Sequence, residues 1–205
     1  MINKIATKDV IELLGAIGAL GGLAFGLYQY SVNQKWQQSE LAAKQLEMLS
    51  TDPKLWMCCL FLDWATRRIP IPEDYKIFDA EKLGYFVHKW DVLTAAMRPE
   101  NEKHEFPFPQ VLYRDYFGYF FDYLERVNHY LEIELFSPGD VSSLSYWLKE
   151  IAMPRNAPEE LQASIFREFV RHYGYEDVES LMRRFEISFQ NEPPQMRDSL
   201  ANTDH

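Results

Sequence analysis

The stretch LLGAIGALGGLAFGLY, residues Leu13–Tyr28, decides the expected fold because it carries no charge and has glycines at helical spacing. Val10 and Ile11 precede it, and Glu12 is the one charged residue between them and the run. A helix needs about 20 predominantly apolar residues to cross the hydrocarbon of a bilayer. The stretch therefore predicts an N-terminal transmembrane helix over residues 10–30.

The residues on either side of this run separate three interpretations. Aromatic side chains with a polar tip, which favour the headgroup layer, follow its C-terminal end at Tyr28, Tyr30 and Trp36. Lys4 and Lys8 resemble the basic start of a secretory signal, but no small-residue cleavage site follows the run. An uncleaved membrane anchor is the main prediction. A cleaved signal peptide and a buried or surface helix are the alternatives.

One face of the predicted helix consists of small residues. At about 100° per residue, five of them fall within a sector of about 100°: Gly15, Gly18, Ala19, Gly22 and Gly26. Bulky apolar residues occupy the rest of the circumference, and Glu12 and Gln29 lie at the two ends of the small face. In lipid, close backbone approach through small residues is a main route to helix association. The pattern predicts a homo-oligomeric contact; the alternative is that glycines are simply frequent in membrane helices.

The rest of the chain divides into a stalk, a domain and two tails. No helix breaker separates the anchor from the stalk at residues 31–50, so we expect one continuous helix over Val10–Leu49, about 60 Å long. The stalk carries a modest apolar stripe of Trp36, Ala43, Leu46 and Leu49. Residues 51–190 are expected to form an α-helical domain. Residues 1–9 form a short N-terminal tail, and the polar, proline-bearing residues 191–205 a disordered one.

Apolar periodicity with capping and stop signals predicts an all-α fold, in which a bundle of about five or six helices follows the anchor and stalk. The expected helices cover residues 53–68, 80–97, 110–136, 138–152, 158–173 and 176–188. Asp52 with Pro53 starts the first of these, and Asp79 caps the second. No strand is expected beyond a short extended pairing at Ile69–Ile71.

Charge and cysteine content limit the partners and the compartment. The formal net charge is −10, and the first 50 residues balance to zero, so the negative charge lies on the domain and its tail. Such a surface repels phosphate backbones and anionic lipid surfaces, which argues against nucleic acid as the main partner. The partners that we expect are membrane lipid, a second copy and a protein. Cys58 and Cys59 are adjacent and poorly placed to form a bridge. A domain without disulfides suits a reducing compartment, so we expect it to face the cytoplasm.

Signals for catalysis or for a cofactor are weak. The expected helix at 110–136 carries an acidic stripe with one histidine, formed by Asp115, Asp122, Glu125, His129 and Glu132. A di-iron bundle requires Glu-x-x-His on two helices, whereas Glu125 and His129 are four residues apart and occur once. Cys58 and Cys59 have no basic neighbour within a helical turn and are expected in the core. We predict no metal, no cofactor and no identified catalytic site.

Arg167 and His172 in REFVRH are the one catalytic alternative. An arginine four to six residues before a histidine on a helix resembles the active-site motif of the HEPN family of all-helical ribonucleases. There the two residues act on RNA across a dimer. The resemblance implies a membrane-tethered ribonuclease. A motif this short also arises by chance, and surface salt-bridge residues are the structural alternative.

Five phrases form a set: LYQYSVNQKWQQSELAAK, LFLDWATRRI, YRDYFGYFFDYLERVNHYLE, SYWLKEI and FVRHYGYEDVESLMRRF. The first contains Trp36 and Glu40, and the second contains Leu62, Asp63 and Trp64. The set resembles a group of uncharacterised bacterial single-pass membrane proteins over most of residues 20–187. That resemblance implies a bacterial inner (plasma) membrane location, one anchor and a helical domain, and brings no functional residue with it. Asp63 and the Arg114–Asp115 dipeptide are expected to form buried pairs that fix helix register.

These features predict a membrane-anchored helical interaction, signalling or effector protein. It is expected to self-associate through the small face of the anchor helix, which we call the glycine face. The alternative is a HEPN-type ribonuclease using Arg167 and His172. A membrane-disrupting effector is a third possibility.

Overall fold

The computed structural model describes residues 2–78, 83–99, 106–158 and 165–189, of which residues 2–13 and 16 are described by their backbone alone. The described chain is largely helical, with one sheet of two strands. The all-α prediction is confirmed at that level, and the sheet is a departure from it.

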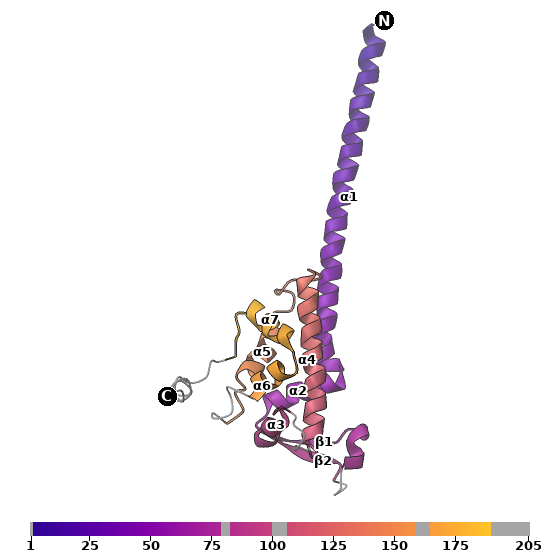
Figure 1. Ribbon diagram of the computed structural model, residues 1–205. Coiled ribbons are helices and arrows are strands. Elements are labelled where there is room, and N and C mark those ends of the chain that lie inside the picture. The colour runs from indigo at the N-terminus through magenta and orange to yellow at the C-terminus, as the bar shows by residue number, and fades with distance from the viewer. Residues whose placement is uncertain (1, 79–82, 100–105, 159–164, 190–205) are drawn as a thin grey trace, which may run out of the picture.

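Helix α1 (Ile2–Thr51) is a single long helix whose N-terminal part projects away from the rest of the molecule (Figure 1). The continuous helix expected over Val10–Leu49 lies within it, and the helix begins at Ile2. It ends where Asp52 caps helix α2 (Pro53–Asp63). The Asp52 carboxylate accepts hydrogen bonds from the backbone N–H groups of Lys54, at 2.8 Å, and of Leu55, at 3.1 Å. We call everything from α2 onward the body.

The C-terminal third of α1 packs against the body. Its buried side chains are Ala42, Gln45 and Leu49. Trp36 and Ala43 are exposed, so half of the predicted stripe is wrong. The reason is that Ala42 shares the inward side of the helix with Gln45 and Leu49, and Ala43 is turned about 100° further round. The Tyr123 hydroxyl donates to the Gln45 carbonyl at 2.9 Å and ties this face to the body.

Helix α4 (Gln110–Glu132) is the centre of the body, lying beside α1 and α2 (Figure 1). Helices α3 (Trp90–Ala96) and α7 (Glu176–Arg184) pack against α4, α5 (Leu144–Ala152) packs against α2, and α6 (Ile165–His172) packs against α5 and α7. The core between them is strongly aromatic. Phe61 of α2 meets Tyr113 edge-on with ring centres 4.8 Å apart, and Phe117 packs on Phe166 at 4.8 Å.

The helix expected over residues 80–97 is wrong in its middle. Tyr85–Lys89 forms strand β2, which pairs antiparallel with strand β1 (Thr66–Pro70) in a register that sets Ile69 opposite Phe86. Phe86 and His88 are buried while Val87 is exposed, which is the two-residue period of a strand. Cross-strand pairing outweighed the local helical pattern. The 3-10 helix η1 (Glu73–Phe78) lies between the strands in sequence.

Several helix ends also differ from the expected ones. Helix α5 begins at Leu144, not near Ser137, because Ser137 belongs to a turn. In that turn Asp140 accepts hydrogen bonds from the Ser137 N–H at 2.9 Å and from its hydroxyl at 2.6 Å. Helix α4 ends at Glu132 and α7 at Arg184, each a few residues earlier than expected. The expected tail at 191–205 and the cap at Asp79 lie outside the described residues.

Candidate functional site

The projecting part of α1 exposes apolar side chains on every side. Its large apolar residues are each between 58% and 67% exposed: Leu14, Ile17, Leu20, Leu23, Phe25 and Leu27. They are followed by Tyr28 and Tyr30, 66% and 69% exposed, and by Trp36 at 64%. Contiguous exposed apolar surface of this kind marks an interaction site for protein or membrane.

The glycine face is open within the single chain. A methyl group added at Gly15, Gly18, Gly22 or Gly26 would meet no atom within 4 Å. At 100° per residue, Gly22 and Gly26 lie about 160° around the helix from Ala42, which faces the body. The glycine face and the packed face therefore lie on nearly opposite sides of α1.

A search of the described helices for a stretch long and apolar enough to cross a membrane finds none. The membrane span, the single pass and the glycine contact thus have no support from helix hydropathy.

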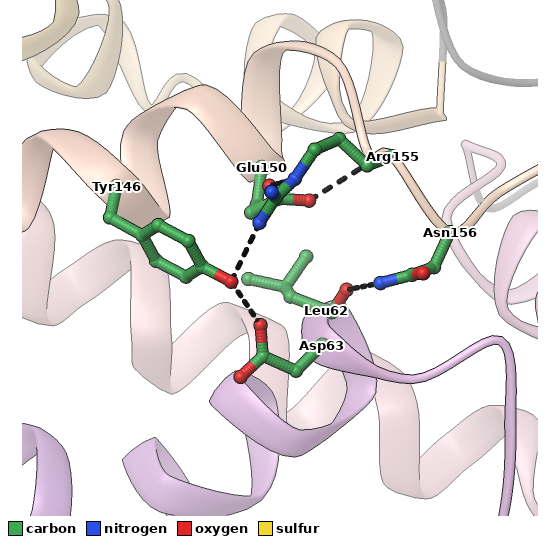
Figure 2. A network of polar contacts seen from close by, with 6 residues as sticks. All are labelled: Leu62, Asp63, Tyr146, Glu150, Arg155 and Asn156. Carbon is green, nitrogen blue, oxygen red and sulfur yellow. Dashed lines mark hydrogen bonds and ion pairs between the residues drawn. The ribbon is translucent and has the colours of Figure 1, made fainter.

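A polar network in the body joins α2, α5 and the turn after α5 (Figure 2). The Tyr146 hydroxyl donates to the Asp63 carboxylate and accepts from Arg155 Nη2 at 2.8 Å. Arg155 also pairs through Nε with Glu150, whose second oxygen accepts the Arg155 backbone N–H at 3.1 Å. Asn156 donates to the Leu62 carbonyl at 3.3 Å. Figure 2 shows one continuous chain of contacts that runs through Asp63, Tyr146, Arg155 and Glu150, with the Asn156 contact beside it.

Burial explains why this network is arranged as it is. The Glu150 side chain is 3% exposed, so its charge needs a partner, whereas the Arg155 side chain remains 63% exposed. The Glu150 carboxylate raises the pKa of Arg155 above its ordinary value. The network borders a cavity of about 360 Å³. The carboxylates of Asp63 and Glu150 each accept a hydrogen bond, so neither is free to act as a base. The network instead holds α2, α5 and the turn after α5 together, and we call it the clamp.

Among the described residues, Asp63 and Asp115 do not form the buried pairs expected of them, because both are exposed. Asp63 is exposed and accepts from Tyr146, and Asp115 accepts from the Tyr75 hydroxyl at 2.6 Å. Arg114 Nη1 donates to the carbonyls of Ala96, at 2.6 Å, and Arg98, at 2.8 Å, and so caps the end of α3. These residues fix helix packing through tyrosines and backbone carbonyls.

A buried histidine was missed by the sequence reasoning. His88 of β2 is fully buried, and its Nδ1 is hydrogen-bonded to the Tyr113 hydroxyl at 2.7 Å. Burial lowers the pKa of His88 to about 4, although backbone groups of Trp64 and Phe61 favour the charged ring. The ring is therefore neutral at physiological pH. The alternation of Tyr85–Lys89 was the signal that could have placed it inward.

Of the acidic stripe of α4, Glu132 takes part in the packing against α7. Asn128, fully buried, donates to Glu132 at 3.0 Å and to Asp177 at 3.3 Å, and accepts from Arg184 Nε at 3.0 Å. Among the described residues, no three histidine, cysteine, aspartate or glutamate side chains gather to hold a metal ion. Burial and the nearby Asp177 and Asp122 carboxylates raise the pKa of Glu125.

Arg167 and His172 lie at opposite ends of α6. Arg167 is half-buried, and His172 is exposed with its ring edge-on to Tyr173 at 4.8 Å. Five residues of helix separate them by about 140° around the axis. The single chain does not bring them onto one face. Cys58 and Cys59 are buried and free, in line with core packing.

Comparisons with known protein families, with curated proteins and with solved structures find no match for this chain. The resemblance to bacterial single-pass membrane proteins therefore stays a prediction.

Proposed function

We propose that this protein is a membrane-anchored interaction or signalling component in which α1 holds the helical body at a lipid bilayer. The observation that carries the proposal is the exposure of apolar side chains on every side of α1 from Leu14 to Leu27. Exposed apolar surface on a projecting helix is unfavourable in water and favourable in hydrocarbon. In the sequence, the apolar residues Val10, Ile11 and Leu13 precede this segment.

The residues expected in the headgroup layer lie between the apolar segment of α1 and its first contact with the body. Gln38 is the first residue of α1 with a hydrogen bond to the body in the described structure, to the Glu134 carbonyl at 3.2 Å. Between Leu27 and Gln38 lie Tyr28, Tyr30 and Trp36, which suit a headgroup layer. The body would thus sit just outside the bilayer, on the cytoplasmic side of a bacterial inner membrane. Its two free cysteines support a reducing compartment.

Self-association through the glycine face is the second part of the proposal. Because that face points away from the body, two parallel copies can bring their glycines together and keep both bodies on the outside. Close approach of this kind is a common mode of pairing in lipid. The face comprises Gly15, Gly18, Ala19, Gly22 and Gly26.

Carbonate extraction tests the anchor. An inserted helix keeps the full chain in the membrane pellet after washing at high salt and alkaline pH, whereas release into the supernatant refutes insertion. The ribonuclease alternative is tested on the same sample: RNA cleavage that is lost in both Arg167→Ala and His172→Ala would favour it over the proposal.

A further inference from the structure

A polar cavity of about 620 Å³ lies where α1 enters the body. One wall is α1, through Lys35, Gln38 and Ser39, and the other is the segment after α4, through Glu134, Ser137 and Asp140. Among the described residues, neither Lys35 nor Glu134 forms an ion pair within the chain. The cavity therefore holds opposite charges that are not engaged with each other.

The sequence places this cavity at a particular depth, provided that the proposed anchor is correct. The proposed anchor, the run of residues 10–30, spans about 32 Å at 1.5 Å per residue, close to the roughly 30 Å of hydrocarbon in a bilayer. Lys35 is the first charged residue after that run. Lysines at such a boundary reach into the headgroup layer. The cavity thus opens at the level of the lipid headgroups.

Glu134, which lines the cavity, lies in the turn that ends α4. The N–H of Leu135 bonds to the Tyr130 carbonyl at 2.9 Å and that of Glu134 to the Leu131 carbonyl at 3.3 Å, which is the Schellman end of a helix. Glu134 occupies the left-handed position of this motif, with φ 56°. Glycine is preferred there, and a side chain is unfavourable. The chain thus keeps a carboxylate beside the cavity where the fold alone favours glycine.

The charged residues that line the cavity indicate which kind of headgroup is complementary to it. The residues that line the cavity include two with carboxylates, Glu134 and Asp140, and one with an ammonium, Lys35. Hydrogen bonds from Ser137 lower the pKa of Asp140, so this carboxylate is ionised at neutral pH. A purely anionic headgroup would be repelled by the two carboxylates, whereas a headgroup with both a phosphate and a primary ammonium offers each wall its opposite charge.

We propose that this cavity binds the phosphoethanolamine headgroup of a membrane lipid, with the lipid phosphate at Lys35 and Ser39 and its ammonium at Glu134 and Asp140. The inference rests on the proposed anchor, since it is the anchor that brings the cavity to the headgroup layer.

Native mass spectrometry of the detergent-solubilised full chain tests this inference with phosphatidylethanolamine and phosphatidylglycerol as probes. Retention of phosphatidylethanolamine should exceed that of phosphatidylglycerol several-fold, and Lys35→Gln should lower it several-fold. Glu134→Gly should weaken retention to a similar degree while raising the melting temperature. Glu186→Gly is the matched control: Glu186 has φ 58° at the end of α7, so the change should stabilise the chain and leave lipid retention unaltered.

Equal retention of the two lipids, or retention unchanged in both Lys35→Gln and Glu134→Gly, overturns the inference. If soluble glycerophosphoethanolamine binds as tightly as the lipid does, the ligand need not come from a membrane, and that part of the inference is overturned. The anchor is judged separately: a chain that resists carbonate extraction but shows no lipid preference refutes the headgroup site alone, and a chain that is extracted refutes the anchor.

Discussion

Gln38 of α1 donates its side-chain amide to the backbone carbonyl of Glu134, 3.2 Å away, and this contact marks where the long helix meets the body. On the N-terminal side of this contact the described side chains of α1, from Leu14 to Gln37, are exposed, and on its C-terminal side Ala42, Gln45 and Leu49 are buried. One continuous helix therefore has two environments. Because no break interrupts the helix, the angle around its axis between the exposed glycines and the buried face is fixed.

Replacing Gly22 by isoleucine should weaken self-association. A Cβ added at Gly22 meets no atom within 4 Å, so it has room within one chain, and we expect the larger side chain to obstruct a neighbouring copy. Crosslinking in detergent should show a several-fold loss of dimer. Leu20→Ile on the bulky face is the control and should crosslink like the parent chain. Equal loss in both variants would remove the glycine face from the account.

Replacing Asp52 by alanine should destabilise the body by about 1 kcal/mol, the usual value of a helix N-cap. The carboxylate accepts two backbone N–H groups of α2 and also the Tyr119 hydroxyl at 3.0 Å. Urea unfolding measures the change. Asp52→Asn retains the cap and should lose much less, and Tyr119→Phe isolates the hydroxyl bond. An Asp52→Ala variant as stable as the parent would show that the cap is unimportant.

The stability of the body should fall as the pH is lowered from about 6.5 toward 4. His88 is held neutral in the fold, with its pKa lowered to about 4, while in the unfolded chain it takes up a proton near 6.5. The unfolded state then binds more protons, so stability is complete above 6.5 and is lost progressively below it, by at most about 3 kcal/mol. His88→Gln should flatten this part of the pH profile. A parent profile that is level between pH 6.5 and 4 contradicts the neutral buried ring.

Removing Arg155 should lower the melting temperature by several degrees, because it leaves the buried Glu150 carboxylate without its ion pair. Adding Glu150→Gln to Arg155→Ala removes the unpaired charge and should restore part of the loss. Thermal unfolding of the two variants beside the parent measures both effects. If the double variant is no more stable than the single one, the cost does not come from the buried charge.

The sequence predicts the elements that depend on local signals. The long helix followed from the absence of a breaker between Val10 and Leu49, and the start of α2 from Asp52 and Pro53. Strand β2 was missed because Tyr85–Lys89 depends on pairing with β1, a contact between residues far apart in sequence. The start of α5 was predicted too early for a different reason: the Asp140 carboxylate accepts the Ser137 N–H in a local turn that precedes the helix.

The candidate sites were predictable to different degrees. The glycine face could be read from spacing, since it needs one helix. The clamp of Asp63, Tyr146, Glu150 and Arg155 could not, because it joins α2 to α5 and the turn after it through a tertiary arrangement. The cavity beside Lys35 likewise depends on how the end of α4 lies against α1.

Cysteine accessibility along α1 tests the central claim most directly. Cys58 and Cys59 are buried, and burial raises the pKa of both thiols, that of Cys59 to about 12, so they give little background labelling. Leu20→Cys and Gln37→Cys are placed singly in the full chain in membranes and treated with a water-soluble maleimide. The account predicts that position 37 is labelled and position 20 is protected until detergent is added; equal labelling of both positions before detergent would contradict it.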